Sequence, residues 1–222
     1  MLDMGYFMYN THNYYEFCAM TKISEKQLYE IASGQQGYFT AQQAISAGYQ
    51  INNHPYYVKQ GHWIREYRGI YRLSNFPSEA EAEYVLWSLW SCDRKGQVQG
   101  VYSFETALSI YDVSDAMPAK LHMTVPKKFR RSRETPNILV LHRDDLGEND
   151  YKTMRGFRVT TPFRTLLDLI NSNEIDDYLI QQAANEFLSR GLLLRKEALA
   201  LIEKAPQAAK FFIEKKKTEL KS

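Results

Sequence analysis

The side chains that could support catalysis or metal binding are densest in one short stretch, where Asp144, Asp145, Glu148 and Asp150 precede Lys152. Carboxylates grouped in this way can hold a divalent cation, as in a metal-dependent nuclease. The surrounding sequence, LHRDDLGENDYK, is rich in polar and turn-forming residues and is more typical of a hairpin loop. We therefore favour a polar loop over a metal site.

No other catalytic or metal-binding motif is found in the sequence, which lacks a glycine-rich phosphate loop, HExxH, GxSxG and paired CxxC. The five histidines, at positions 12, 54, 62, 122 and 142, are scattered without ligand spacing. Of these, His122 and His142 fall on predicted strands and are expected to be core or edge residues. We predict no enzyme activity, no catalytic residue, no cofactor and no metal site.

Positive charge is concentrated in two places, and the first is the segment PKKFRRSR at Pro126–Arg133. It lies between two predicted strands, so one interpretation is a solvated loop. A second interpretation is a contact with the DNA backbone, additional to the one considered below for another part of the chain. A third is a docking patch for an acidic or nucleotide-binding partner. The residues of this candidate docking patch are Lys127, Lys128, Arg130, Arg131 and Arg133.

The second concentration lies between Thr40 and Asn75, where four basic residues meet a single acid, Glu66. The local excess of three positive charges stands out in a chain whose formal net charge is +2. Such an excess is typical of a phosphate-binding surface. The alternative is an edge strand that carries Lys and Arg only as protection against aggregation.

The same region predicts a compact series of short elements. Thr40 can cap a helix over Ala41–Ala47, which Gly48 ends. A second helix should begin near His54-Pro55 and end at Gly61. Two strand-like runs follow, joined by Arg68-Gly69 as a hairpin turn. Helix, turn, helix and hairpin together predict a winged helix-turn-helix.

The second helix of this module is the predicted reading element, because a recognition helix meets base edges in the major groove of DNA. Val58 and Ile51 are expected to face the core, and Tyr57, Tyr67 and Tyr71 to be packing residues. The predicted DNA-binding residues are Asn52, Asn53, His54, Tyr56, Lys59 and Gln60 on the helix and its N-terminal end, with Arg65, Arg68 and Arg72 on the wing.

The rest of the chain predicts an N-terminal extension at residues 1–19 and a C-terminal domain at 77–222, on either side of the winged domain at 20–76. The Trp-rich helix Ser78–Ser91 is so apolar that we expect it to be buried in the C-terminal domain. Short strands then precede several amphipathic helices, so the predicted fold class is α+β, with a small sheet and a helical C-terminal half.

The composition of the chain indicates the cellular compartment in which the protein is expected. The longest apolar runs fall well short of the roughly 18 residues that a membrane helix needs. The first twenty residues lack the basic start and apolar middle of a signal peptide. Cys18 and Cys92 form no redox or metal motif and suit a reducing compartment. We expect a cytoplasmic protein with no membrane partner.

The order of four strings resembles the AbiEi-type antitoxins of abortive-infection (type IV) toxin–antitoxin systems: YRGIYRL, a Trp-rich helix, VYSFETAL and VTTPFRTLLDL. The resemblance runs from about Met20 to the end of the chain. It implies an N-terminal winged domain that binds inverted repeats at its own promoter as a repressor. It also implies a C-terminal domain that neutralises a nucleotidyltransferase-like toxin. Arg164 and Asp168 would then pair within a structural helix of the antitoxin domain.

A second hypothesis comes from another functional class. The chain would be a stand-alone winged-helix transcriptional regulator, with a C-terminal domain that senses a ligand. A nucleotidyltransferase gene beside this one would favour the antitoxin, whereas a metabolic operon would favour the ligand-responsive regulator.

Overall fold

The structure, a computed structural model, describes residues 23–77, 81–131 and 134–212. The predicted N-terminal extension at residues 1–19 and Arg133 of the basic segment lie outside the described residues. The chain divides into two compact units, each described below by itself: residues up to Val98 together with Arg155–Phe157, and Gln99–Met154 together with the residues from Arg158 onward.

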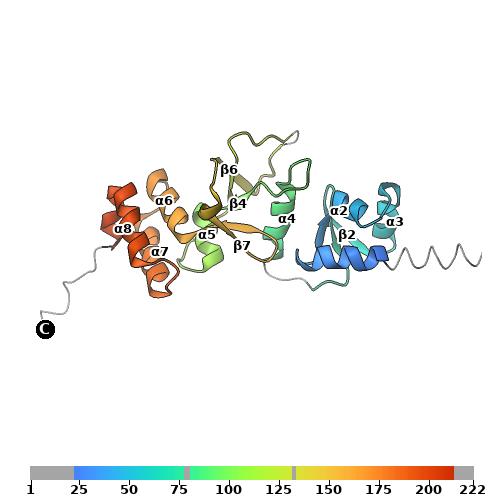
Figure 1. Cartoon of the computed structure of the whole chain (residues 1–222), viewed down its shortest axis with the longest axis horizontal. Coiled ribbons are helices and arrows are strands. Elements are labelled where there is room, and N and C mark those ends of the chain that lie inside the picture. The colour runs from blue at the N-terminus through green and yellow to red at the C-terminus, as the bar shows by residue number, and fades with distance from the viewer. Residues whose placement is uncertain (1–22, 78–80, 132–133, 213–222) are drawn as a thin grey trace, which may run out of the picture. The chain divides into compact units, whose positions relative to one another are not determined.

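The first unit is built on a three-stranded antiparallel sheet with the strand order β1-β3-β2 (Figure 1). Its elements in chain order are helical residues 23–33, β1 (Tyr38–Thr40), α2 (Ala41–Ser46), the 3-10 turn η1 (Ile51–Asn53), α3 (His54–Lys59), β2 (Trp63–Tyr67), β3 (Ile70–Leu73) and α4 (Ala82–Trp90). The predicted pair of short helices and the hairpin around Arg68-Gly69 are therefore present.

Local chemistry sets the limits of α2 as the sequence predicts. The Thr40 side chain accepts a hydrogen bond from the Gln43 amide at 3.2 Å, and the Gln43 side chain accepts one from the Thr40 amide at 2.8 Å. This reciprocal capping box satisfies two amides that the first turn leaves without partners. Gly48 then takes a φ of +98°, which a side chain would oppose.

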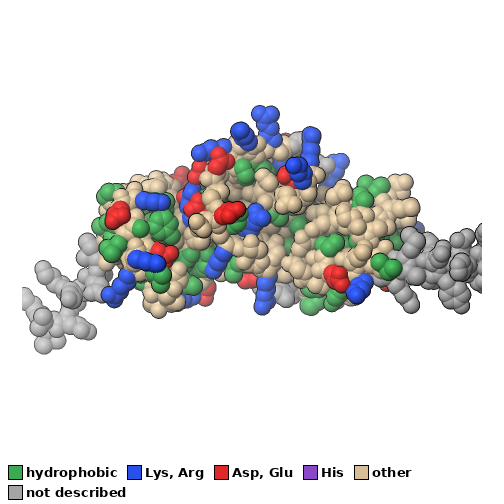
Figure 2. Space-filling model, viewed as in Figure 1, with side chains coloured by type: hydrophobic (Ala, Val, Ile, Leu, Met, Phe, Trp, Pro, Cys, Tyr) green, Lys and Arg blue, Asp and Glu red, His purple; other side chains and the backbone are tan. Residues whose placement is uncertain are grey.

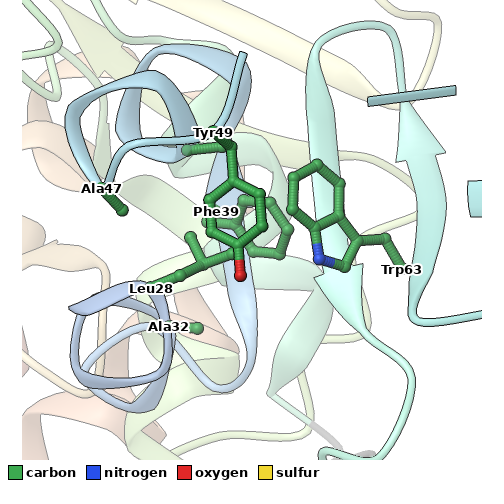
Figure 3. Close-up of a cluster of buried hydrophobic side chains, with 7 residues drawn as sticks. Leu28, Ala32, Phe39, Ala47, Tyr49 and Trp63 are labelled. Carbon is green, nitrogen blue, oxygen red and sulfur yellow. The ribbon is translucent and has the colours of Figure 1, made fainter. Parts of the chain in front are cut away.

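Apolar and aromatic side chains from the helices and the sheet form one core in the first unit. Figure 3 shows Phe39, Tyr49 and Trp63 with their rings close together, while Leu28 and Ala32 approach from the first helix. Val58 packs against this cluster as predicted, but Ile51 does not, because 61% of its surface is exposed. Ile51 begins the 3-10 turn, and this short turn carries its side chain outward.

Helix α4 corrects the predicted domain division. It packs on β1 and β3 and belongs to the first unit, whereas the sequence placed it in the C-terminal domain after Pro77. The Tyr67 and Trp87 rings meet at 5.4 Å, joining the hairpin to this helix. The apolar surface of α4 thus packs on the sheet that precedes it in the sequence and, through Tyr84, on Phe157.

The second unit contains a five-stranded mixed sheet with the strand order β6-β5-β4-β8-β7. The pairs β5–β6 and β4–β8 are parallel, and the pairs β4–β5 and β7–β8 are antiparallel. Its elements are β4 (Val101–Tyr102), α5 (Phe104–Tyr111), β5 (Leu121–Val125), β6 (Leu139–Arg143), η2 (Glu148–Asp150), β7 (Tyr151–Thr153), β8 (Arg158–Thr160), α6 (Pro162–Ser172), α7 (Asp177–Ser189), α8 (Arg195–Lys204), η3 (Pro206–Ala208) and α9 (Ala209–Phe212).

Helix α5 lies against this sheet and also packs on α6, and Figure 1 shows α6, α7 and α8 gathered as a helical group. Buried in this unit are Tyr102, Met123, Leu166 and Phe187. The small sheet followed by a helical C-terminal half confirms the predicted α+β fold class. Across the described parts of the chain, no helix is both long and apolar enough to cross a membrane.

Gly37 offers a test of how tightly the first unit is packed. Its φ is +86°, and a Cβ there would lie 2.6 Å from Cβ and Cγ of Phe76. Gly96 has a similar φ of +79° but has open space around it. We expect Gly37→Ala to lower the free energy of unfolding by about 2–4 kcal/mol, because strain and a steric clash add. Gly96→Ala should cost only about 1 kcal/mol, from backbone strain.

Urea unfolding followed by tryptophan fluorescence would measure both losses, because all three tryptophans, Trp63, Trp87 and Trp90, lie in the first unit. Equal losses for the two variants would contradict the packing described for Gly37.

Candidate nucleic-acid interface

Helix α3 has one face in the core and one face in solvent. Its six residues begin with His54-Pro55, where proline fits the first turn, and Gly61 follows with a φ of +75°. The buried or half-buried side chains His54, Tyr57 and Val58 follow an i, i+3, i+4 pattern. Five of the six residues predicted to contact DNA from this helix and its N-terminal end are exposed: Asn52, Asn53, Tyr56, Lys59 and Gln60.

His54 is the exception, and the prediction that it contacts DNA is wrong. Only 2% of its surface is exposed, and its ring centroid lies 5.2 Å from that of Trp63 and 5.8 Å from that of Tyr71. Burial lowers the pKa of His54 below its ordinary value, although a hydrogen bond to the Tyr49 backbone opposes the shift. A neutral imidazole is therefore a core residue of the first unit.

The hairpin presents two of its three predicted arginines. Arg65 and Arg68 are exposed, with Arg68 in the turn between β2 and β3. Arg72 is only 16% exposed, because its Nε donates to Glu66 Oε1 at 2.7 Å and its Nη1 donates to the Phe76 carbonyl at 3.4 Å. Arg72 therefore holds the hairpin together, and the prediction that it contacts DNA is wrong.

The tyrosines behave as the packing residues that the sequence predicts. Tyr57 stacks on Trp63 with ring centroids 4.8 Å apart, and Tyr71 stacks on Phe39 at 5.8 Å. Tyr56 is different, because 58% of its surface is exposed. The candidate interface therefore combines one exposed aromatic ring and three amides with Lys59, Arg65 and Arg68.

A groove of about 590 Å³ lies on another side of α3. Tyr57 lines it from α3, and Trp63 and His62 line it from the start of the hairpin. Burial raises the pKa of Tyr49 to about 12, and the nearby charge of Glu25 adds to the shift. The remaining lining residues are Glu25, Lys26, Leu28, Tyr29, Tyr49, Leu73, Ser74 and Asn75. A volume of this size matches small-molecule sites.

In the second unit, the basic segment after β5 forms an anchored loop. Phe129 is buried, and Arg143 donates hydrogen bonds to the carbonyls of Phe129 at 2.8 Å and Lys127 at 3.4 Å. Lys127 Nζ also lies 3.0 Å from Asp144 Oδ1. Figure 2 shows Lys and Arg side chains gathered over this part of the unit, beside β6. The exposed cations of the segment in the described residues are Lys127, Lys128, Arg130 and Arg131.

The acidic cluster considered as a nuclease site is built around a cation of the chain itself. Arg164 lies 2.6 Å from Asp144, 2.8 Å from Asp168 and 3.7 Å from Asp150. Hydrogen bonds from Arg164 and Lys127 lower the pKa of Asp144 to about 2. The predicted pair of Arg164 and Asp168 is confirmed, and the structure adds two carboxylates to it. These carboxylates compensate the charge of the half-buried Arg164, which would be costly to leave unpaired.

His122 and His142 lie half-buried on neighbouring strands, as expected for sheet residues. Burial lowers the pKa of both, that of His142 to about 4. Their rings are in contact, with His122 Nδ1 3.1 Å from His142 Nε2. Their sequence positions carry no signal for this contact, because it depends on the register of β5 and β6.

Comparison with solved structures shows a similar fold. No family model and no curated protein matches the chain. A crystal structure of the RV2827C protein from Mycobacterium tuberculosis is similar with a TM-score of 0.52 and 12% sequence identity. The match covers 85% of this chain and 73% of that chain. At this identity the similarity concerns the fold alone.

The burial of His54 predicts a pH dependence of stability. Because its pKa is lowered in the folded state, the unfolded chain binds a proton that the folded chain does not between the ordinary value near 6.5 and the lowered value. The contribution of His54 to the free energy of unfolding is therefore fully present above about pH 6.5. It falls as the pH drops from that value toward the lowered pKa of the folded state. We expect His54→Phe to reduce this loss, because its phenyl ring carries no titrating group.

The measurement is the urea midpoint of tryptophan fluorescence at several pH values between 7.5 and 5.0. Each protein is compared with its own value at pH 7.5, so a constant packing defect of His54→Phe cancels. The same acid-induced loss in both proteins would mean that His54 is not a buried neutral imidazole.

Proposed function

We propose that this chain is a sequence-specific DNA-binding protein, with α3 as its reading helix and the β2–β3 hairpin as its wing. The observation that supports the proposal best is the division of α3. Its core face is fixed by Tyr57 and Val58, while Tyr56, Lys59 and Gln60 share the exposed face. An α-helix fits the major groove of B-DNA, where amides pair with adenine and lysine contacts guanine edges or phosphate.

The hairpin supports the same proposal. Arg65 and Arg68 add positive charge at an exposed strand and turn, and arginines there suit contacts with the phosphate backbone. Helix α3 has only six residues, so a single copy can reach few base pairs. Pairs of half-sites in an operator would supply the remaining specificity, as the resemblance to repressors of inverted repeats implies.

We further propose that the chain is an AbiEi-type antitoxin that represses its own operon and neutralises a nucleotidyltransferase-like toxin in abortive phage infection. This part rests on the resemblance of the strings YRGIYRL, VYSFETAL and VTTPFRTLLDL and on their order. The basic loop adds support, because its anchored backbone presents Lys128 and Arg130 toward solvent. A preformed cationic surface suits an acidic or nucleotide-handling partner.

The groove beside α3 favours a second candidate function, a ligand-responsive transcriptional regulator. Tyr57 belongs to α3 and lines the groove, so a ligand bound there would contact the reading helix from behind. The neighbouring gene distinguishes the two proposals: a nucleotidyltransferase gene supports an antitoxin, whereas genes of metabolism support a ligand-responsive regulator.

The reading-helix proposal predicts specific losses of operator affinity. We expect Lys59→Ala and Arg68→Ala each to weaken binding to the DNA upstream of the gene. Each should also reduce the slope of log K against log salt by roughly one unit, because one phosphate contact is lost. Fluorescence anisotropy with a labelled duplex at several salt concentrations measures both quantities.

Lys26→Ala is the matched control, because Lys26 is an exposed lysine on the first helix of the same unit. It removes the same charge at a residue that belongs to neither α3 nor the hairpin. If Lys26→Ala had the same effect as Arg68→Ala, net charge would explain the binding and the assignment of the wing would fail.

The antitoxin proposal predicts a role for the basic loop in the full-length chain. We expect the double variant Lys128→Glu/Arg130→Glu to lose neutralisation of the toxin encoded alongside, because charge reversal repels an acidic docking surface. Its affinity for the operator should stay within about twofold of the wild-type value. Growth of cells that express both proteins measures neutralisation, and anisotropy measures operator binding.

Arg195→Glu/Lys196→Glu makes the same change in charge at two exposed residues at the start of α8. This control should still neutralise the toxin. A Lys128→Glu/Arg130→Glu variant that neutralises normally but binds the operator weakly would instead assign the loop to DNA.

A further inference from the structure

Two histidines of the second unit face each other across neighbouring parallel strands. His122 on β5 pairs in register with Val140, and His142 on β6 pairs with Thr124, so the two histidines are diagonal neighbours on the sheet. The distance from His122 Nδ1 to His142 Nε2 is 3.1 Å, and the two rings are inclined by 29°. One ring nitrogen of each histidine therefore lies within hydrogen-bond distance of the other, close enough for both to bind one small ion.

Glu105 fixes the orientation of the first histidine. It lies in the first turn of α5, and its Oε2 is 3.2 Å from His122 Nε2. A carboxylate at this distance accepts a hydrogen bond, so the Nε2 of His122 carries the proton and its Nδ1 presents a lone pair toward His142. A carboxylate behind a histidine is the arrangement that orients metal-ligating imidazoles.

The second histidine is held by a strained residue. Phe104 takes a φ of +53°, a left-handed conformation that is costly for a bulky side chain. Its ring stacks on His142 with centroids 3.8 Å apart and an interplanar angle of 20°. The His122 backbone is also fixed, because its amide donates to Thr106 Oγ1 at 2.7 Å. Both imidazoles are thus held in place before any ligand arrives.

We propose that His122 and His142 form a divalent transition-metal site, with Glu105 as the residue that positions His122. With metal–nitrogen bonds of about 2.0–2.1 Å, two nitrogens 3.1 Å apart subtend an angle of about 100° at the metal, which lies between octahedral and tetrahedral values. Imidazole ligands select Zn²⁺, Cu²⁺ or Ni²⁺ over Mg²⁺ or Ca²⁺.

Without metal, His142 donates its Nε2 proton to the lone pair of His122 Nδ1. Metal binding moves that proton to His142 Nδ1, so both rings stay neutral and no net proton is released. Among the described residues no third His, Cys, Asp or Glu completes a ligand group, so water fills the remaining positions and affinity is lower than at a structural zinc site.

The test is titration of the full-length, tag-free protein with Zn²⁺ by isothermal titration calorimetry. We expect one site per chain that is lost or weakened at least tenfold in His122→Ala and His142→Ala. Glu105→Gln should weaken the site about 10–100-fold, as removal of an orienting carboxylate does elsewhere. The double variant His12→Ala/His62→Ala is the control and should keep the wild-type affinity, because it removes two other histidines.

Cu²⁺ gives a second measurement that does not depend on variants folding. Its electron paramagnetic resonance spectrum should show hyperfine coupling to two imidazole nitrogens in the wild-type protein. The proposal is overturned if 100 µM Zn²⁺ does not bind, if the His122→Ala and His142→Ala proteins keep wild-type affinity, or if Glu105→Gln has no effect. Loss of the site in the His12→Ala/His62→Ala control would overturn it as well.

Discussion

Packing around Trp63 is the interaction on which the first unit depends. Its ring centroid lies 4.9 Å from that of Phe39 on β1, 4.8 Å from that of Tyr57 on α3 and 5.1 Å from that of Tyr49. An isolated helix of six residues is unstable in water, because the free-energy cost of nucleation exceeds the stabilisation from so few hydrogen bonds. Helix α3 therefore owes its existence to the aromatic residues behind it. The exposed face of α3 is positioned by residues that lie in the core behind it.

The need to hold α3 also explains the burial of His54. Its ring closes the cluster between Trp63 and Tyr71, at the point where the chain passes from η1 into α3. A polar ring in this place costs stability, and its Nε2 is buried without a hydrogen-bond partner among the described residues. Pro55 limits the conformations of the chain at the same point. The N-terminal end of α3 is thus fixed by packing, while Asn52 and Asn53 remain exposed beside it.

Local signals in the sequence predicted most elements of the fold, and long-range pairing explains what they missed. Thr40, Gly48 and Pro55 act on their own neighbours, so the helix limits around them follow from the sequence. Helix α3 is too short to show which side of it His54 occupies. The Arg72–Glu66 pair depends on how β2 folds back on β3, and α4 could be assigned to a unit only once the sheet beneath it was known. Seven of the nine residues predicted to contact DNA are therefore exposed, whereas His54 and Arg72 are not.

The charged residues of the second unit also fall into two groups. Some pair with one another and hold the basic loop in place, and others are exposed on that loop. Asp144 contacts both Arg164 on α6 and Lys127 in the basic loop, so it links the helix to the loop. Arg143 adds hydrogen bonds to the carbonyl groups of the loop. The acidic residues that resembled a catalytic cluster thus neutralise the half-buried Arg164 and the exposed Lys127. Because that neutralisation is internal to the unit, the outward positive charge of the loop is left to Lys128 and its exposed basic neighbours, on a backbone that is already held in place.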